Sequence, residues 1–208
     1  MIWFSWTIDN EKAIIDVINS FSRKVILIAG ASCAGKTTFA KFLGQSLHDS
    51  YTLNMDNYFK DLDDPTLPNA DKYLSFDQLE SYHLDRIGSC VDDLLNGRKV
   101  PIPIYNLELN RRQGHRMVQL YDPGTIIVDG LFAFALNLPN HDVVKVFLEA
   151  DGDERCARRV KRDRLYFPNA SSNSIQRVFV GKVEPAYRDL VLPYRSEADI
   201  VIDTTKRR

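Results

Sequence analysis

The stretch that decides the fold is VILIAGASCAGKTTFAKFL, residues 25–43. It opens with a continuous apolar run bounded by glycine, which is typical of a parallel strand buried on both faces. Residues 30–37 then match the pattern G-x-x-x-x-G-K-[ST], and a helical pattern follows directly. A strand, a glycine-rich loop and a helix in this order predict a phosphate-binding loop, because the loop N–H groups and the helix N-terminus both favour an anion.

The pattern predicts which residues of this loop contact the phosphates and the metal. Lys36 is expected to reach the terminal phosphates of a nucleotide, and the Thr37 hydroxyl is expected to ligate Mg²⁺. The other nucleotide contacts are expected from Gly30, Ala31, Ser32, Cys33, Ala34, Gly35 and Thr38. The sequence therefore predicts ATP and Mg²⁺ as ligands.

Apolar runs and helical patterns alternate along the rest of the chain. Further strands are expected at 125–130 and 143–148, with weaker candidates at 50–55 and 199–203. Helices are expected at 9–22, 37–48, 77–96, 153–166 and 173–190. This alternation predicts an α/β fold, a parallel five-stranded sheet flanked by helices. A small β-hairpin at about 100–121 and a helical lid at about 153–170 are expected to elaborate a single domain.

Composition and charge limit the partners of the chain. Its 208 residues are 44% hydrophobic and 26% charged, as in an ordinary globular protein. With 27 basic and 28 acidic residues, the net charge of -1 predicts binding neither to nucleic acid nor to an anionic membrane. No apolar stretch is long enough to span a membrane, and the opening MIWFSW lacks the cationic start of a signal peptide. Three cysteines at unpatterned spacing favour a reducing, cytoplasmic location. Assembly into homo-oligomers stays open.

Two aspartates are expected at the carboxyl ends of strands, on the same edge of the sheet as the loop. Asp129 follows an apolar run and is expected to hold the metal, directly or through water. Asp56 follows a weaker strand and is expected to accept the proton of the acceptor hydroxyl, and it is also expected among the metal-binding residues with Thr37 and Asp129. The alternative for each is a local capping role in a turn.

Residues 155–164 hold six cationic side chains in ten positions. At helical spacing Arg155, Arg158, Arg159 and Arg162 share one side of a helix. This favours a lid whose arginines, Arg159 and Arg162 above all, stabilise a transferring phosphoryl group. The alternative is a solvated helix face.

Together these motifs resemble the uridine kinases of the phosphoribulokinase and uridine kinase group, over residues 24–203. Residues 30–38 resemble the family loop G-x-S-x-S-G-K-T-T, 55–60 the D-S-F-Y segment with the catalytic base, and 75–77 the N-F-D segment whose Asp holds the ribose hydroxyls. Residues 103–105 are similar to P-x-Y, 128–134 to E-G-I-L-A-F and 158–163 to the R-R-x-x-R-D lid. The resemblance implies ATP-dependent phosphorylation of the 5′-hydroxyl of a ribonucleoside, uridine or cytidine. It implies substrate contacts from Asp77, Tyr105, Tyr58, Phe76 and Asn110.

The chain departs from the family where the base is read. The family's Y-D-F-x-x-H is YNLELN at 105–110, so Leu107 and Asn110 replace an aromatic residue and a histidine. The R-G-R triplet after the lid is absent, and Asp129 stands where Glu is usual. Two alternatives therefore remain, a kinase of another riboside or small hydroxylated metabolite, and an ATP-binding regulatory protein with impaired catalysis. A GTPase or transport ATPase is disfavoured, because neither N-K-x-D nor L-S-G-G-Q occurs.

Overall fold

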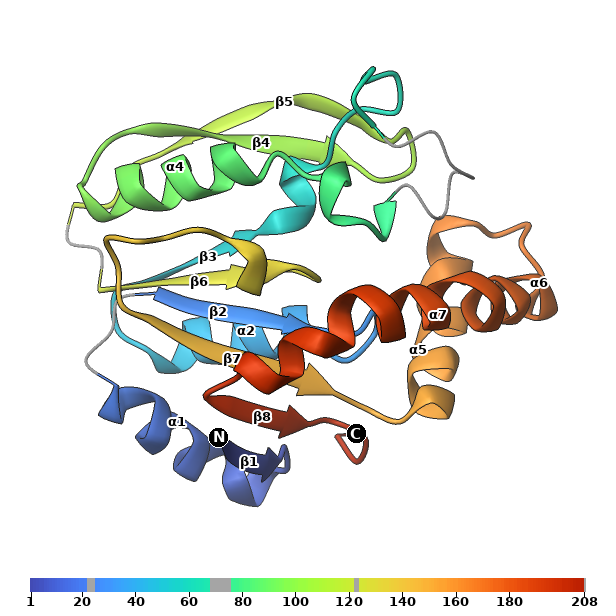
Figure 1. Ribbon diagram of the computed structural model, residues 1–208, viewed down its shortest axis with the longest axis horizontal. Helices are drawn as coiled ribbons and strands as arrows, with labels where there is room; N and C mark the ends of the chain where they lie inside the picture. The colour runs from blue at the N-terminus through green and yellow to red at the C-terminus, as the bar shows by residue number, and fades with distance from the viewer. Residues whose placement is uncertain (22–24, 68–75, 122–123, 208) are drawn as a thin grey trace.

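The computed structural model describes residues 1–21, 25–67, 76–121 and 124–207. Its centre is a six-stranded parallel sheet in the order β1-β8-β7-β2-β6-β3 (Figure 1). The strands of this sheet are β1 (Ile2–Ser5), β2 (Val25–Gly30), β3 (Ser50–Asn54), β6 (Thr125–Asp129), β7 (Val143–Glu149) and β8 (Ile200–Asp203). A separate antiparallel hairpin is formed by β4 (Val100–Asn106) and β5 (Arg111–Val118).

Helices connect the strands and cover both faces of the sheet. The α-helices are α1 (Glu11–Ser20), α2 (Lys36–Ser46), α4 (Leu84–Leu95), α5 (Gly152–Tyr166), α6 (Ser172–Val178) and α7 (Glu184–Ala186). The π-helical segment η5 (Phe179–Val183) joins α6 to α7, and a second one, η6 (Tyr187–Val191), continues the helical run after α7. Short 3₁₀ turns are η1 (Ile8–Asn10), η2 (Met55–Tyr58), η3 (Leu79–Ser81), η4 (Ala133–Ala135) and η7 (Leu192–Glu197). Within the described residues, no helix combines the length and apolar character needed to cross a membrane.

The central strand β2 is buried along its whole length. Ile26 and Ile28 pack into the layer that contains α1 and α2, and Leu27 packs into the opposite layer with α4. Because both faces of β2 are covered, its sequence is apolar without polar alternation. Figure 1 shows α5, α6 and α7 gathered beyond the carboxyl ends of β2 and β7, where the site lies.

The expected α/β fold is confirmed, but the sheet has six strands and not the expected five. The additional strand is β1, which pairs with β8 and places Ile2 opposite Ile200. It has four residues at the edge of the sheet, and Ile2 and Trp3 are 41% and 54% exposed. So short a run carries too little periodicity to be recognised as a strand.

Helix boundaries also differ from the expected ones. The helix expected at 77–96 is α-helical from Leu84, and a 3₁₀ turn, η3, precedes it. The helix expected at 9–22 begins in η1 and its α-helical part ends at Ser20, while residue 22 lies outside the described residues. The helix expected at 173–190 is interrupted by the two π-helical segments.

Gly30 marks a close approach between β2 and β7, which yields a prediction. Its φ is +137°, and a Cβ there would overlap the carbonyl oxygen of Leu148. Gly30→Ala is expected to lower the free energy of unfolding by about 1–3 kcal/mol or more, measured by urea denaturation. The control is Gly181→Ala, because a Cβ at that position meets no atom within 4 Å. The control should be neutral or slightly stabilising, and equal losses in both variants would contradict the close approach.

Candidate functional site

The loop at residues 30–37 connects the carboxyl end of β2 to the N-terminus of α2. Cys33 and Gly35 have positive φ angles of 62° and 87°, and the N–H of Ala34 donates to the carbonyl of Ala31 at 3.1 Å. These conformations turn the chain tightly around the start of the helix. The loop therefore has the shape that its sequence pattern predicts.

Lys36, the first residue of α2, lies inside this turn. Its ammonium group donates to the carbonyl oxygens of Gly30 at 3.1 Å and Ala31 at 2.9 Å. Burial lowers the pKa of Lys36, and the negative charges of Asp129 and Asp56 oppose this shift. The two carboxylates thus offset part of the cost of burying a cation.

Asp129 ends β6 beside the loop, as expected. The Thr37 hydroxyl donates to Asp129 Oδ2 at 2.7 Å, and Asp129 is 2% exposed. Burial raises the pKa of Asp129, while the charge of Lys36 and the hydrogen bond from Thr37 oppose the shift. A carboxylate and a hydroxyl side by side are oxygen ligands of the kind that Mg²⁺ prefers, so the residues present fit such an ion.

Asp56 lies in η2, directly after β3. Its N–H donates to the Asn54 side chain at 2.8 Å, which caps the turn. Burial and the nearby charge of Asp129 raise the pKa of Asp56 to about 6, against the attraction of Lys36. A carboxyl group with a pKa near neutrality is suited to accept a proton from a hydroxyl.

A cavity of about 660 Å³ joins these groups. Its walls come from the loop, the ends of β3 and β6, the turn of the hairpin and α5. The site residues expected from the sequence that line it are Ser32, Cys33, Gly35, Lys36, Thr37, Thr38, Asp56, Phe76, Asp77, Asn110, Asp129, Arg159 and Arg162. Gly30, Ala31 and Ala34 belong to the loop but are not among the lining residues.

Asp77 contributes a third carboxylate to the cavity. Burial raises its pKa, while the positive charges of Arg159 and Arg162 oppose this. Ser75, which begins the segment similar to N-F-D, lies outside the described residues. Asp77 therefore lines the same cavity as Lys36, under the influence of the positive charges of Arg159 and Arg162.

Two residues expected to contact substrate, Tyr58 and Tyr105, do not line this cavity. Tyr58 is buried and lines a second cavity of about 450 Å³ together with His115 of the hairpin. Tyr105 donates its hydroxyl to the Lys60 carbonyl at 3.1 Å. Phe59 lines the first cavity instead of Tyr58. Both are aromatic and adjacent, and only the geometry of η2 decides which of them faces the cavity.

The arginines of α5 have different surroundings, although they were expected to share one face. Arg155 is 3% exposed, its guanidinium donates to Glu184 at 2.9 Å, and it stacks on Tyr187 with 4.6 Å to the ring centroid. It is therefore part of the packing between helices. Arg158 contacts the loop and Thr204, and it lines the cavity together with Arg159 and Arg162.

Arg159 and Arg162 line the cavity and share one partner. Their Nε atoms donate to the two oxygens of Asp163, at 2.6 Å and 2.9 Å. Arg159 also donates to the Ser32 hydroxyl at 3.2 Å, which connects α5 to the loop. Asp163 was not among the expected site residues, although its position directly after Arg162 could have suggested an orienting role.

The family model described as phosphoribulokinase / uridine kinase family matches residues 25–208. The chain belongs to this family. Within the phosphoribulokinase/uridine kinase family, a chloroplastic uridine/cytidine kinase of Arabidopsis thaliana is 29% identical over 184 residues, which cover 86% of this chain and 37% of that protein. The chain thus spans well under half of that relative. A uridine kinase of Mycoplasma pneumoniae is 30% identical, covering 89% of this chain and 88% of that protein.

A solved structure has the same fold. The structure of a possible uridine kinase from Bacillus stearothermophilus matches with a TM-score of 0.66 and 20% identity, covering 94% of this chain and 98% of that one. Because the match covers nearly the whole of both chains, it supports the P-loop kinase fold expected from the sequence.

The raised pKa of Asp56 predicts that this residue destabilises the fold. Its pKa is 3.8 when unperturbed and about 6 in the structure, so between these values the folded protein binds more protons than the unfolded one. Stability from this group falls as pH rises, and the full penalty is present above about pH 6. Asp56→Asn should therefore raise the free energy of unfolding at about pH 8 by roughly 1–3 kcal/mol, and by little near pH 4.

Urea denaturation at the two pH values measures this effect. The matched control is Asp16→Asn, which removes an exposed carboxylate from α1. If Asp56→Asn were no more stable than the wild type at the higher pH, the buried Asp56 carboxylate would not destabilise the folded protein.

Proposed function

We propose that this chain transfers the γ-phosphate of ATP, with Mg²⁺, to the 5′-hydroxyl of a ribonucleoside, uridine or cytidine. The observation that carries the proposal is the position of Asp56 in the same cavity as Lys36 and the Thr37–Asp129 pair. A proton acceptor beside a phosphate-binding loop is what phosphoryl transfer to an alcohol requires. The relatives named as uridine kinases support a nucleoside as the acceptor.

The donor half of the cavity would hold the nucleotide. The loop N–H groups and Lys36 bind the phosphates, and Thr37 and Asp129 hold the metal. Bound Mg²⁺ would supply positive charge that neutralises the phosphate oxygens. This role for Lys36 is supported by its position inside the loop, where it donates to the carbonyls of Gly30 and Ala31 and is attracted by the negative charges of Asp129 and Asp56.

The acceptor half of the cavity would hold the nucleoside. Asp56 accepts the proton of the attacking hydroxyl, and Asp77 accepts hydrogen bonds from the ribose hydroxyls. Arg159 and Arg162 stabilise the charge on the transferring group, and Asp163 keeps their guanidinium groups oriented. Closing α5 over this half excludes water from the reaction.

A second candidate is a kinase of a different riboside. Leu107 and Asn110 line the cavity where the family has an aromatic residue and a histidine, so the base would meet an aliphatic side chain and an amide. Initial rates on a panel of pyrimidine and purine ribosides distinguish the two candidates. Nucleotide binding without turnover of any of them would favour the regulatory alternative.

Loss of the proton acceptor should reduce turnover. Asp56→Asn keeps the shape of the side chain, so kcat is expected to fall by about 10²-fold or more while ATP binding persists. In the wild type, kcat/KM should rise with pH up to about 6 and level above it, because only the ionised carboxylate accepts a proton. Asp63→Asn, at an exposed carboxylate outside the cavity, serves as control. A near-normal kcat for Asp56→Asn would exclude Asp56 as the base.

Recognition of the ribose should appear as discrimination against deoxyribose. A carboxylate makes charge-assisted hydrogen bonds, so ribonucleosides should exceed 2′-deoxyribonucleosides by roughly ten-fold to a hundred-fold in kcat/KM. Asp77→Asn should lower this ratio of kcat/KM values while it leaves the KM for ATP nearly unchanged. Equal turnover of both sugars by the wild type would remove Asp77 from the proposed acceptor site.

A further inference from the structure

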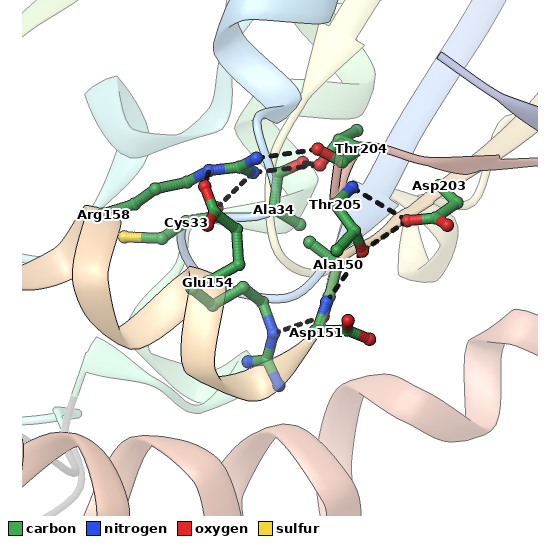
Figure 2. Close-up of polar contacts among 10 residues, drawn as sticks. Cys33, Ala34, Ala150, Asp151, Glu154, Arg158, Asp203, Thr204 and Thr205 are labelled. Atoms are coloured by element: carbon green, nitrogen blue, oxygen red, sulfur yellow. Dashed lines mark hydrogen bonds and ion pairs between the residues drawn. The ribbon is translucent and has the colours of Figure 1, made fainter. Parts of the chain in front are cut away.

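The residues after β8 contact the phosphate-binding loop from outside the cavity, although 170 positions separate them in sequence (Figure 2). Thr204 is 1% exposed. Its hydroxyl donates to the Ala34 carbonyl at 2.9 Å and accepts from Arg158 Nη1 at 3.0 Å. This single hydroxyl therefore bonds to both the loop and α5, which fixes its orientation.

Arg158 completes the connection between these segments. Its Nη1 also donates to the Cys33 carbonyl at 3.3 Å, and its Nη2 donates to the Thr204 carbonyl at 2.7 Å. Glu154 accepts from Nε at 2.8 Å and holds the guanidinium in this position (Figure 2). Two consecutive carbonyls of the loop are thus held by side chains, that of Cys33 by Arg158 of α5 and that of Ala34 by Thr204, which lies outside the cavity.

The anchor at Ala34 sets the direction of the next N–H group. In a trans peptide the C=O and N–H bonds point in opposite directions, so a carbonyl held on Thr204 directs the Gly35 N–H away from Thr204. Gly35 lines the cavity and Thr204 does not. Because glycine at a φ of 87° has wide conformational freedom, the Ala34–Gly35 peptide depends on an external contact to keep one orientation.

We propose that Thr204 is a positioning residue for nucleotide binding, whose hydroxyl holds the Ala34–Gly35 peptide so that the Gly35 N–H faces the phosphates. The proposal rests on the proposed function for the nature of the ligand. It assigns a role to a residue outside both the loop pattern and the lid, and Thr204 acts through the loop without touching the nucleotide.

Thr205 provides an internal comparison. Its hydroxyl donates to Asp203 Oδ1 at 2.6 Å and accepts from the Asp151 N–H at 3.1 Å (Figure 2). It is therefore a threonine in the same turn, with two hydrogen bonds of similar length, whose partners lie outside the loop. Any effect of general loosening at the end of the chain should appear equally when this hydroxyl is removed.

The test measures ADP binding in the presence of Mg²⁺ by isothermal titration calorimetry. Thr204→Val keeps the shape of the side chain and removes the hydroxyl, so the dissociation constant should rise about 3- to 10-fold. Thr204→Ala, which cannot clash, should show the same loss. Thr204→Ser should restore wild-type affinity to within about two-fold, since the hydroxyl returns. Thr205→Val should bind ADP as the wild type does.

Steady-state kinetics and stability separate positioning from a merely structural role. In Thr204→Val the KM for ATP should rise by the same factor while the KM for the nucleoside stays unchanged. Urea denaturation should show comparable losses of stability for Thr204→Val and Thr205→Val. Wild-type ADP affinity in Thr204→Val, or equal weakening in Thr205→Val, would overturn the proposal. A wild-type protein that binds ADP with these variant effects but phosphorylates no nucleoside would refute the proposed function and leave the positioning role standing.

Discussion

The parallel pairing of β2 with β6, and of β6 with β3, is the constraint on which the rest of the site depends. The register places Ile28 opposite Asp129, and Asn54 opposite the same Asp129. The chain leaves all three strands at one edge of the sheet, so Lys36, Asp129 and Asp56 meet there although they lie far apart in sequence. A slip of one residue between β2 and β6 would turn the Asp129 side chain to the other face and separate it from Thr37, and a slip between β6 and β3 would displace Asp56 from Asp129.

The site concentrates charges that the surrounding apolar core does not favour. Burial raises the pKa values of Asp56, Asp77 and Asp129, and it lowers that of Lys36. Each group is compensated in part by its neighbours, since the ammonium lies beside two carboxylates and Arg159 and Arg162 offset the third. The pKa shifts that remain after this compensation are typical of functional sites, where buried side chains titrate at a different pH from exposed ones. A bound nucleotide and cation would change this balance at every one of these groups together.

The parts of the site that the sequence predicts are those that depend on local patterns. The loop, the helix that follows it and the strand-end aspartates could be recognised because an apolar run and a polar residue at its end are adjacent in the chain. The helical spacing of the arginines was also informative, but it could not show that the face they share meets Glu184 at one end and the cavity at the other.

Other features depend on contacts that no local pattern carries. The edge strand β1 is too short to show a period, and the choice between Tyr58 and Phe59 is made by the geometry of one 3₁₀ turn. Thr204 follows the last strand of the sheet, where a threonine has no distinguishing neighbours, and its contact with Ala34 exists only in the folded chain.

The buried Arg155 fixes the first turns of α5 and leaves the far end of the helix less constrained. Its Nε donates to the Ala150 carbonyl and its guanidinium is held by Glu184, so the first turns of the helix are attached to the body of the protein. Arg162 lies seven positions further along, roughly 10 Å at 1.5 Å per residue, and the helix ends in side chains such as Leu165 that are largely exposed. A tilt about Arg155 would therefore displace residue 162 about twice as far as residue 158, which lies only three positions, or roughly 4.5 Å, from Arg155. The end of α5 that lines the cavity is therefore held less directly than its first turns, through the contact of Arg159 with the Ser32 hydroxyl of the loop.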